Sequence, residues 1–307
     1  WIWPYDQGGC ACEKCRPWGA NGFLVMAEGI AKLARKRFPR VRNILSTWLF
    51  DFRKDEGEWS GLGRALAAKP DWLDYLLADS HADFPKYLLE HEVPGGLPLI
   101  NFPEISMWGM CPWGGIGANP LPDRFQRLWN QGKDRLSGGF PYSEGLFEDL
   151  NKAICTQFYW QADRPVEDIV REYVRFEFGS QVVGEVTEAI FILEKNHHHA
   201  VYMKMFTDTS MKRVDGAADA GSLRAFSLLE EADAKLAPGV RASWRWRILY
   251  LRALVDRERF ANGMLLTPAC ESALQELTEI YEADRAIGSL SPPSRKAIGR
   301  LQNKGDG

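Results

Sequence analysis

The stretch LPLINFP, residues 97–103, is a short apolar run that is followed by a carboxylate, Glu104. Four other runs have the same character: WIWPY at 1–5, NILSTWLF at 43–50, LDYLLA at 73–78 and LSGGFPY at 136–142. Helical periodicity fills most of the sequence between them. Short apolar runs that alternate with helical segments predict the strands of a parallel sheet.

Five strand–helix units in about 150 residues are too few for a complete eight-stranded barrel, which needs about 250 residues. They match the C-terminal part of a (β/α)₈ TIM-type barrel in the α/β class, with the run at 1–5 as its fourth strand. The chain begins with Trp1 rather than methionine, so we expect it to be a piece of a longer protein. A doubly wound sheet is the alternative, but no glycine-rich phosphate fingerprint follows any of the runs.

The two halves of the chain differ in composition. Ten of the twelve tryptophans precede residue 165, and Pro165 then opens a helical pattern that Gly179 ends. Long helical periodicities follow at 222–236, 244–258, 268–285 and 292–303. We therefore predict a partial (β/α)₈ catalytic barrel over residues 1–164 and an α-helical region over residues 165–307.

Helical faces can be assigned on both sides of this boundary. In residues 21–37, Asn21 is the expected N-cap of a helix. The residues expected on its apolar face are Phe23, Ala27, Ile30 and Ala34. In the later part, the expected apolar face consists of Trp244, Ile248, Leu251 and Val255.

Charge and hydropathy exclude two classes of partner. A formal net charge of −3 and a pI near 6.0 provide no basic surface for a nucleic acid. No apolar run is long enough to cross a bilayer, so no membrane partner is expected. Six cysteines, an even number, would suit disulfides in an exported protein, which predicts a secreted or periplasmic location. The oligomeric state is open.

An acidic residue follows each of the five apolar runs. These residues are Asp6, Asp51, Asp79, Glu104 and Glu144. In a (β/α)₈ barrel the chemistry lies where strands end and loops begin. Carboxylates that face each other across a cleft are typical of glycosidic bond cleavage, since one donates a proton while the other attacks or stabilises the sugar.

We predict three of these acids as catalytic: Glu144 or Glu104 as the general acid/base, and Asp6 as the partner that stabilises charge or orients the substrate. Structural roles are the alternatives. Asp6 could cap a turn, Glu144 could serve a helix dipole, and Asp51 could belong to a solvated loop.

Flat aromatic side chains near the strand ends are expected to support sugar rings, together with polar groups. The expected substrate-binding residues are Trp3, Tyr5, Trp48, Asp51, Asp79, His81, Trp108, Trp113 and Tyr142. The same aromatic residues could instead fill the core.

Cys10, Cys12 and Cys15 place three thiols within six positions, too close for all of them to pair with each other. We favour a disulfide-braced loop, for which Cys111, Cys155 and Cys270 complete the set. A structural zinc held by three thiolates is a weaker alternative because a second C-x-x-C is missing, and an iron–sulfur cluster is weaker still. No cofactor is expected.

Three motifs together resemble a known family: YDQGGCACEKCRPW at 5–18, GGFPYSEGLFEDLNKAICTQFYW at 138–160 and RPVEDIVREYVRFEFG at 164–179. The family consists of bacterial glycoside-hydrolase-like barrels, long labelled a domain of unknown function, with endo-β-N-acetylglucosaminidase relatives. The resemblance spans residues 1 to about 180. It implies a (β/α)₈ barrel followed by helices and places the family's acids on Asp6 and Glu144. Tyr5 stands where the family has asparagine.

The sequence thus predicts a glycoside hydrolase that acts on a complex glycan or polysaccharide. Glycans that contain 2-acetamido sugars are among the candidate substrates. Two alternatives stay open. One is a non-catalytic carbohydrate-binding barrel, and the other is a zinc-dependent enzyme that uses the three clustered cysteines.

Overall fold

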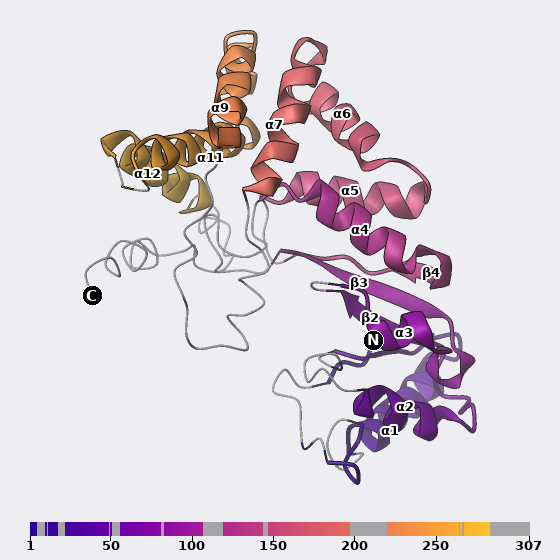
Figure 1. Cartoon of the computed structure of the whole chain (residues 1–307). Coiled ribbons are helices and arrows are strands. Elements are labelled where there is room, and N and C mark those ends of the chain that lie inside the picture. Colours follow the sequence, from indigo (N-terminus) through magenta and orange to yellow (C-terminus); the bar gives the residue numbers. More distant parts are fainter. Residues whose placement is uncertain are drawn as a thin grey trace, which may run out of the picture. The chain divides into compact units, whose positions relative to one another are not determined.

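The computed structural model describes residues 1–4, 10, 12–17, 22–48, 50, 56–80, 83–106, 119–143, 147–196, 220–263, 265 and 267–282. The chain forms two compact units (Figure 1). The first consists of Trp1–Glu104 with Leu128–Pro141, and the second of Ile105–Arg127 with Tyr142–Gly307. The boundary between the two units does not lie at Arg164-Pro165. The assignment of a catalytic barrel to residues 1–164 and of a helical region to residues 165–307 stays a prediction.

A parallel sheet forms the centre of the first unit. Its strands are β1 Ile44–Ser46, β2 Tyr75–Ser80, β3 Leu99–Ser106 and β4 Leu136–Gly139, in the order β1-β2-β3-β4. The two-residue strand β5, Tyr142–Ser143, pairs with β3. Each predicted run from residue 43 onward therefore contributes a strand.

The run at the N-terminus contributes a single parallel bridge among the described residues. Ile2 pairs with Leu45. The Ile2 N–H donates to the carbonyl of Ile44 at 2.8 Å, and the Ser46 N–H donates to the carbonyl of Ile2 at 3.0 Å. The first segment thus lies beside β1, at the edge of the sheet away from β4.

Strand order favours a barrel over a doubly wound sheet. From residues 1–4 to β4, each strand lies beside its neighbour in sequence, and the order never reverses. A doubly wound sheet reverses its order at a switch point, whereas a (β/α)₈ barrel does not. The architecture is α/β with a parallel sheet, consistent with part of a TIM-like fold.

The helices of the first unit cover one face of this sheet. They are α1 Gly22–Arg37, α2 Gly57–Leu66 and α3 Lys86–Glu90, with short 3₁₀ turns at Pro94–Gly96 and Lys133–Arg135. The register aligns Ile2, Leu45, Leu76 and Leu99 in one row across the sheet. All four are buried in the core that α1, α2 and α3 share with the sheet.

Helix α1 confirms the expected periodicity and corrects one position. Phe23 and Ala27 are buried as predicted, but Ile30 is exposed and Ala31 takes the third core position. Positions 23, 27 and 31 follow the i, i+4 spacing, which is one of the two near-equivalent ways to continue an apolar stripe. Packing against the sheet therefore buries Ala31 and leaves the larger Ile30 side chain exposed.

The second unit is mainly helical in its described residues. Its helices are α5 Asp149–Trp160, α6 Val166–Glu177, α7 Val183–Lys195, α9 Ala220–Asp233, α10 Pro238–Arg241, α11 Trp244–Ala261 and α12 Pro268–Glu282, with a 3₁₀ turn at Ser180–Val182. Helix α4, Pro122–Gly132, begins in this unit. Helix α9 packs against both α7 and α11 (Figure 1).

The predicted limits of α6 are confirmed. Pro165 is its N-cap, and Gly179 follows the helix with a φ of 108°, a conformation that favours glycine. The predicted apolar face of α11 is also confirmed, since Ile248, Leu251 and Val255 are buried against α12. In the part of the chain that the structure describes, no helix is both long and apolar enough to span a membrane.

Candidate active site

The sheet of the first unit has a second face, opposite the helices. Side chains alternate between the faces of a strand, and directly paired residues share a face. Because Leu45, Leu76 and Leu99 point to the helical core, the neighbouring row of Ser46, Leu77 and Ile100 points the other way. We call this second side of the sheet the inner face.

Two buried carboxylates lie on the inner face, near the carboxyl ends of adjacent strands. Asp79 pairs with Phe102, and Glu104 is two residues beyond Phe102 on the same strand, so all three side chains share that face. Glu104 is 0% exposed and Asp79 is 6% exposed. Standard strand spacing puts the Cα atoms of Asp79 and Glu104 about 8 Å apart.

Glycosidases carry two carboxyl groups in one site, about 5 to 9.5 Å apart depending on whether the reaction retains or inverts configuration. Two acids on one face of adjacent strands are the kind of arrangement that this chemistry needs. Burying a carboxylate costs free energy unless the surroundings stabilise it, so buried acids on a shared face are candidates for function. The pair of Asp79 and Glu104 therefore marks the candidate active site.

Aromatic side chains lie on the same inner face as this pair. The Trp3 ring lies 5.1 Å from Trp48 and 5.0 Å from Phe102, measured between ring centroids. Trp1 lies 5.3 Å from Trp3, 5.8 Å from Phe102 and 4.1 Å from Phe140. Trp1 and Phe140 remain 48% and 46% exposed, so part of this aromatic cluster is accessible from solvent.

The contact between Trp1 and Phe140 also reports the curvature of the sheet. Trp1 belongs to the segment beside β1, and Phe140 follows β4 directly. In a flat sheet these two edges would be four strand spacings, about 19 Å, apart. Two side chains in contact cannot bridge that gap, so the strands curl toward the inner face, as barrel strands curl around their interior.

The structure brings four of the predicted site residues together on this face: Trp3, Trp48, Asp79 and Glu104. Tyr142 lies in β5, in the second unit, and is half-buried. The others fall outside the described residues: Tyr5, Asp6, Asp51, His81, Trp108, Trp113 and Glu144. The catalytic and binding roles of all twelve stay predictions.

Sequence reasoning missed three members of the aromatic cluster. Trp1 and Phe102 each lie two residues from another inner-face side chain, and Phe140 lies two residues from Gly138, which pairs with Ile100 of that face. All three belong to runs that were already predicted as strands. The signal was therefore the period of two within each run. Because the runs are apolar at nearly every position, this period did not stand out.

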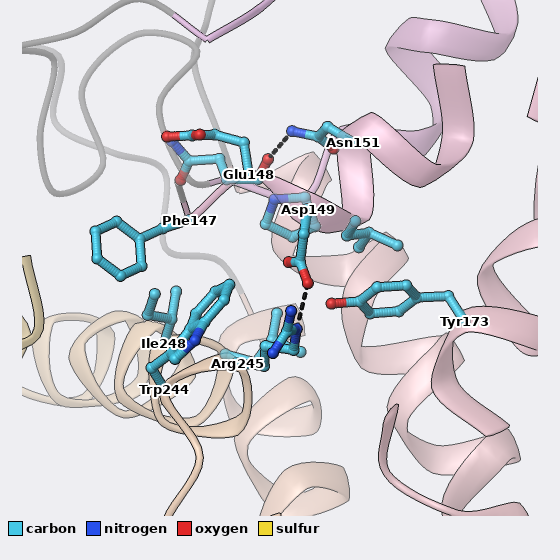
Figure 2. Close-up of a pocket in the computed structure, with 12 residues that line it drawn as sticks. Phe147, Glu148, Asp149, Asn151, Tyr173, Trp244, Arg245 and Ile248 are labelled. Atoms are coloured by element: carbon cyan, nitrogen blue, oxygen red, sulfur yellow. Dashed lines mark hydrogen bonds and ion pairs between the residues drawn. The ribbon is translucent and has the colours of Figure 1, made fainter. Parts of the chain in front are cut away.

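A separate pocket lies in the second unit (Figure 2). Its cavity measures about 30 Å³ and is lined by residues of α5, α6 and α11 and of the segments before α4 and α5. A water needs at least about 10 to 15 Å³, whereas small-molecule sites measure about 300 to 1,000 Å³. The pocket is too small for a sugar ring, so we do not assign it as the substrate site.

Glu148, at the entrance to α5, is a buried acid. Burial raises its pKa, while the Lys152 ammonium at 3.6 Å acts in the opposite direction. The Ser143 hydroxyl donates to the Glu148 carboxylate at 3.3 Å. This bond ties β5 to the start of α5 and indicates a structural role.

The adjacent Asp149 holds three helices together. Its carboxylate pairs with Arg245 of α11 (Figure 2). The Arg245 guanidinium lies 4.4 Å from the centroid of the Trp244 ring, and it also pairs with Glu177 of α6 at 3.4 Å. Burial, together with the Asp149 charge, raises the pKa of the Tyr173 hydroxyl. This network accounts for the charged lining of the small pocket.

Five cysteines are described, and no disulfide joins any two of them: Cys10, Cys12, Cys15, Cys155 and Cys270. The expected disulfide brace is therefore not formed among these five. Cys155 and Cys270 are buried in the second unit, where burial raises their pKa values to about 12 and about 11. These two are inert core residues. Cys111 lies outside the described residues.

Comparisons with known proteins point to a likeness of fold. No family model and no curated protein matches the chain. Among solved structures, the chain is similar to a family GH115 4-O-methyl-α-glucuronidase with specificity for decorated arabinogalactans. The match has a TM-score of 0.53 and 11% identity, and it covers 86% of this chain and 38% of that chain.

This likeness supports a glycoside-hydrolase-like fold alone. The chain spans less than half the length of that enzyme. The likeness adds nothing to the resemblance to endo-β-N-acetylglucosaminidases.

Proposed function

We propose that the protein is a glycoside hydrolase that cleaves a complex glycan or polysaccharide by carboxylate-based acid/base catalysis. One observation carries the proposal. Glu104 is fully buried near the carboxyl end of a central parallel strand, on the curved face that also bears the aromatic cluster. In a (β/α)₈ barrel, that end of the strands is where catalytic residues lie.

The proposed reaction needs two carboxyl groups with different tasks. One donates its proton to the glycosidic oxygen as the leaving group departs. The other attacks the anomeric carbon or activates a water. We assign the acid/base task to Glu104 or Glu144 and the stabilising task to Asp6. Asp79, on the strand next to Glu104, orients substrate hydroxyls.

The aromatic cluster supplies the subsite walls in this proposal. Trp1 and Phe140 expose about half of their surface, and Trp3 and Trp48 are half-buried behind them. Aromatic rings of this kind line most small-molecule sites, with a few polar groups that fix orientation. A sugar ring would lie against the exposed rings with its polar edge toward the acids.

Two groups of substrates are proposed, in order of preference. The structural neighbour is a 4-O-methyl-α-glucuronidase with specificity for decorated arabinogalactans, so decorated arabinogalactans come first. The family resemblance suggests glycans with 2-acetamido sugars, which come second. A polysaccharide substrate also agrees with the proposed secreted or periplasmic location.

The test is hydrolysis of both substrate groups by the wild type and by Glu104→Gln, Asp6→Asn and Glu144→Gln. Loss of a general acid or base costs about 100- to 10,000-fold in rate. Glu90→Gln is the control, because Glu90 is exposed on α3 in the same unit. Circular dichroism checks that each variant is folded. Full activity in all three site variants would refute the assignment.

A non-catalytic carbohydrate-binding barrel is the second candidate, and the exposed part of the aromatic cluster favours it. It predicts that the wild type binds glycans of the panel with no release of reducing sugar. Under this reading Phe140→Ala weakens binding, and Glu104→Gln leaves binding unchanged.

A further inference from the structure

Three cysteines of the first unit form a cluster that the proposed function does not use. The Sγ atoms of Cys10, Cys12 and Cys15 all lie within 4.8 Å of one another. Cys10 and Cys12 are exposed and Cys15 is partly buried, so the cluster is open to solvent. Three thiols this close face one common point.

The backbone holds two of these thiols on the same side of a turn. The Cys12 carbonyl accepts the N–H of Cys15 at 2.9 Å and the N–H of Arg16 at 3.1 Å. The two bonds close a tight turn over C-x-x-C, the spacing that recurs in zinc sites. The geometry of the pair is therefore set by the chain itself.

The turn is also fixed on the body of the unit. Arg16 lies directly against helix α2 at two glycines. A Cβ atom at Gly57 would come within 2.0 Å of the Arg16 guanidinium carbon, and one at Gly61 within 3.0 Å of the Arg16 carbonyl carbon. Pro17, the next residue, is buried. The cysteine turn thus lies against the surface of α2 at two glycines.

We propose that Cys10, Cys12 and Cys15 bind one structural zinc ion. In tetrahedral zinc–thiolate sites the Zn–S distance is about 2.3 Å, which puts the sulfur atoms about 3.8 Å apart. Shifts of about 1 Å or less close the observed cluster to that geometry. A water takes the fourth position.

Ligand chemistry selects zinc over the competing outcomes. A disulfide uses two thiols and leaves the third idle, whereas a zinc ion uses all three. Thiolates favour soft and borderline ions, while calcium and magnesium prefer oxygen ligands. On binding, each thiol gives its proton to solvent and becomes a thiolate ligand. This inference replaces the disulfide brace and the absence of metal that the sequence suggested.

A zinc ion here would fix the far end of the segment that carries Asp6. The near end is already held, because the backbone N–H and the carbonyl of Ile2 both form hydrogen bonds with β1. The metal would tie Cys10 to the turn on α2. The inference stands whether or not the protein hydrolyses glycans.

The test uses the full chain, purified under reducing conditions without chelators. Elemental analysis is expected to find one zinc per chain. Cobalt added to the metal-depleted protein is expected to give thiolate-to-metal charge-transfer absorption. Loss of an outer-shell partner alone costs 10- to 100-fold in metal affinity, so Cys12→Ser is expected to weaken zinc binding by more than about 100-fold. Glu13→Gln, in the same turn, is the matched control and keeps its zinc.

Titration of the wild type with a mercurial reagent covers the case in which Cys12→Ser does not fold. Zinc release that ends when three thiols have reacted supports the site. Absence of zinc from the wild type, a disulfide between any two of the three cysteines in reduced preparations, or full zinc retention by folded Cys12→Ser would overturn the proposal.

Discussion

Glu194 of α7 offers the sharpest test of the physical account of the second unit. Its carboxylate accepts the backbone N–H groups of Asp123 and Arg124 at 2.7 and 2.8 Å, and so caps the start of α4 from a distant helix. The side chain is buried, and burial raises its pKa from 4.5 to about 7, against the lowering effect of these two bonds.

The magnitude follows from linkage. In acid, the carboxyl is protonated in both the folded and the unfolded chain. As the pH rises, the unfolded chain ionises first, near 4.5, and is stabilised relative to the folded chain until the pH passes about 7. Glu194 therefore contributes to the free energy of unfolding below pH 4.5, and this contribution is lost by pH 8. At about 1.36 kcal/mol per pH unit, the loss amounts to about 3 kcal/mol.

The perturbation is Glu194→Gln, because an amide resembles the protonated acid and cannot ionise. We expect the variant to match the wild type in free energy of unfolding near pH 4.5 and to exceed it by up to about 3 kcal/mol at pH 8. Urea unfolding followed by helical circular dichroism, from pH 4.5 to 8, measures the difference. Hydrogen exchange of the peptide 122–132 reports on α4 directly.

Glu188→Gln is the matched control. Glu188 lies on the same helix, half-exposed and paired with Arg224, so its loss costs less than about 1 kcal/mol. The reasoning fails if Glu194→Gln is the less stable protein at pH 8 by 1 kcal/mol or more. That result would mean that the charged cap outweighs the desolvation of the carboxylate.

Further predictions concern packing in the first unit. Gly61→Ala is expected to lower the free energy of unfolding by about 1 to 3 kcal/mol, since its Cβ meets the Arg16 backbone at 3.0 Å. Gly29→Ala, in open space on α1, is expected to raise the free energy of unfolding by about 0.5 to 1 kcal/mol. Thermal unfolding of the two variants measures both changes. Phe102→Ala is expected to cost about 3 to 5 kcal/mol because the ring is buried among tryptophans. Phe140→Ala should cost less than half as much, and equal losses would contradict the described burial of the two rings.

Local sequence signals predicted much of the fold. The four runs from residue 43 onward each give a strand, and α6 begins directly after Pro165 and ends before Gly179 as expected. These features depend on short-range physics. Strands need short apolar runs, proline suits the first turn of a helix, and glycine tolerates a positive φ.

The candidate site was predicted in part. Glu104 and Asp79 were identified because each follows an apolar run. Their common face came only from the register of β2 on β3, which the pattern of a doubly buried strand does not reveal. The clustering of Trp1 with Phe140 likewise required the curvature of the whole sheet.

Tertiary structure also decided which polar residues are buried. Arg252 fits the polar part of the α11 periodicity, yet it is buried, with Asp256 at 3.0 Å and Asn119 at 2.6 Å. Asn119 is 133 positions away in the chain. Sequence by itself determined where strands and helices form, because backbone preference is local. Only the folded chain decided which acids, rings and thiols meet, because those contacts join segments that no local pattern relates.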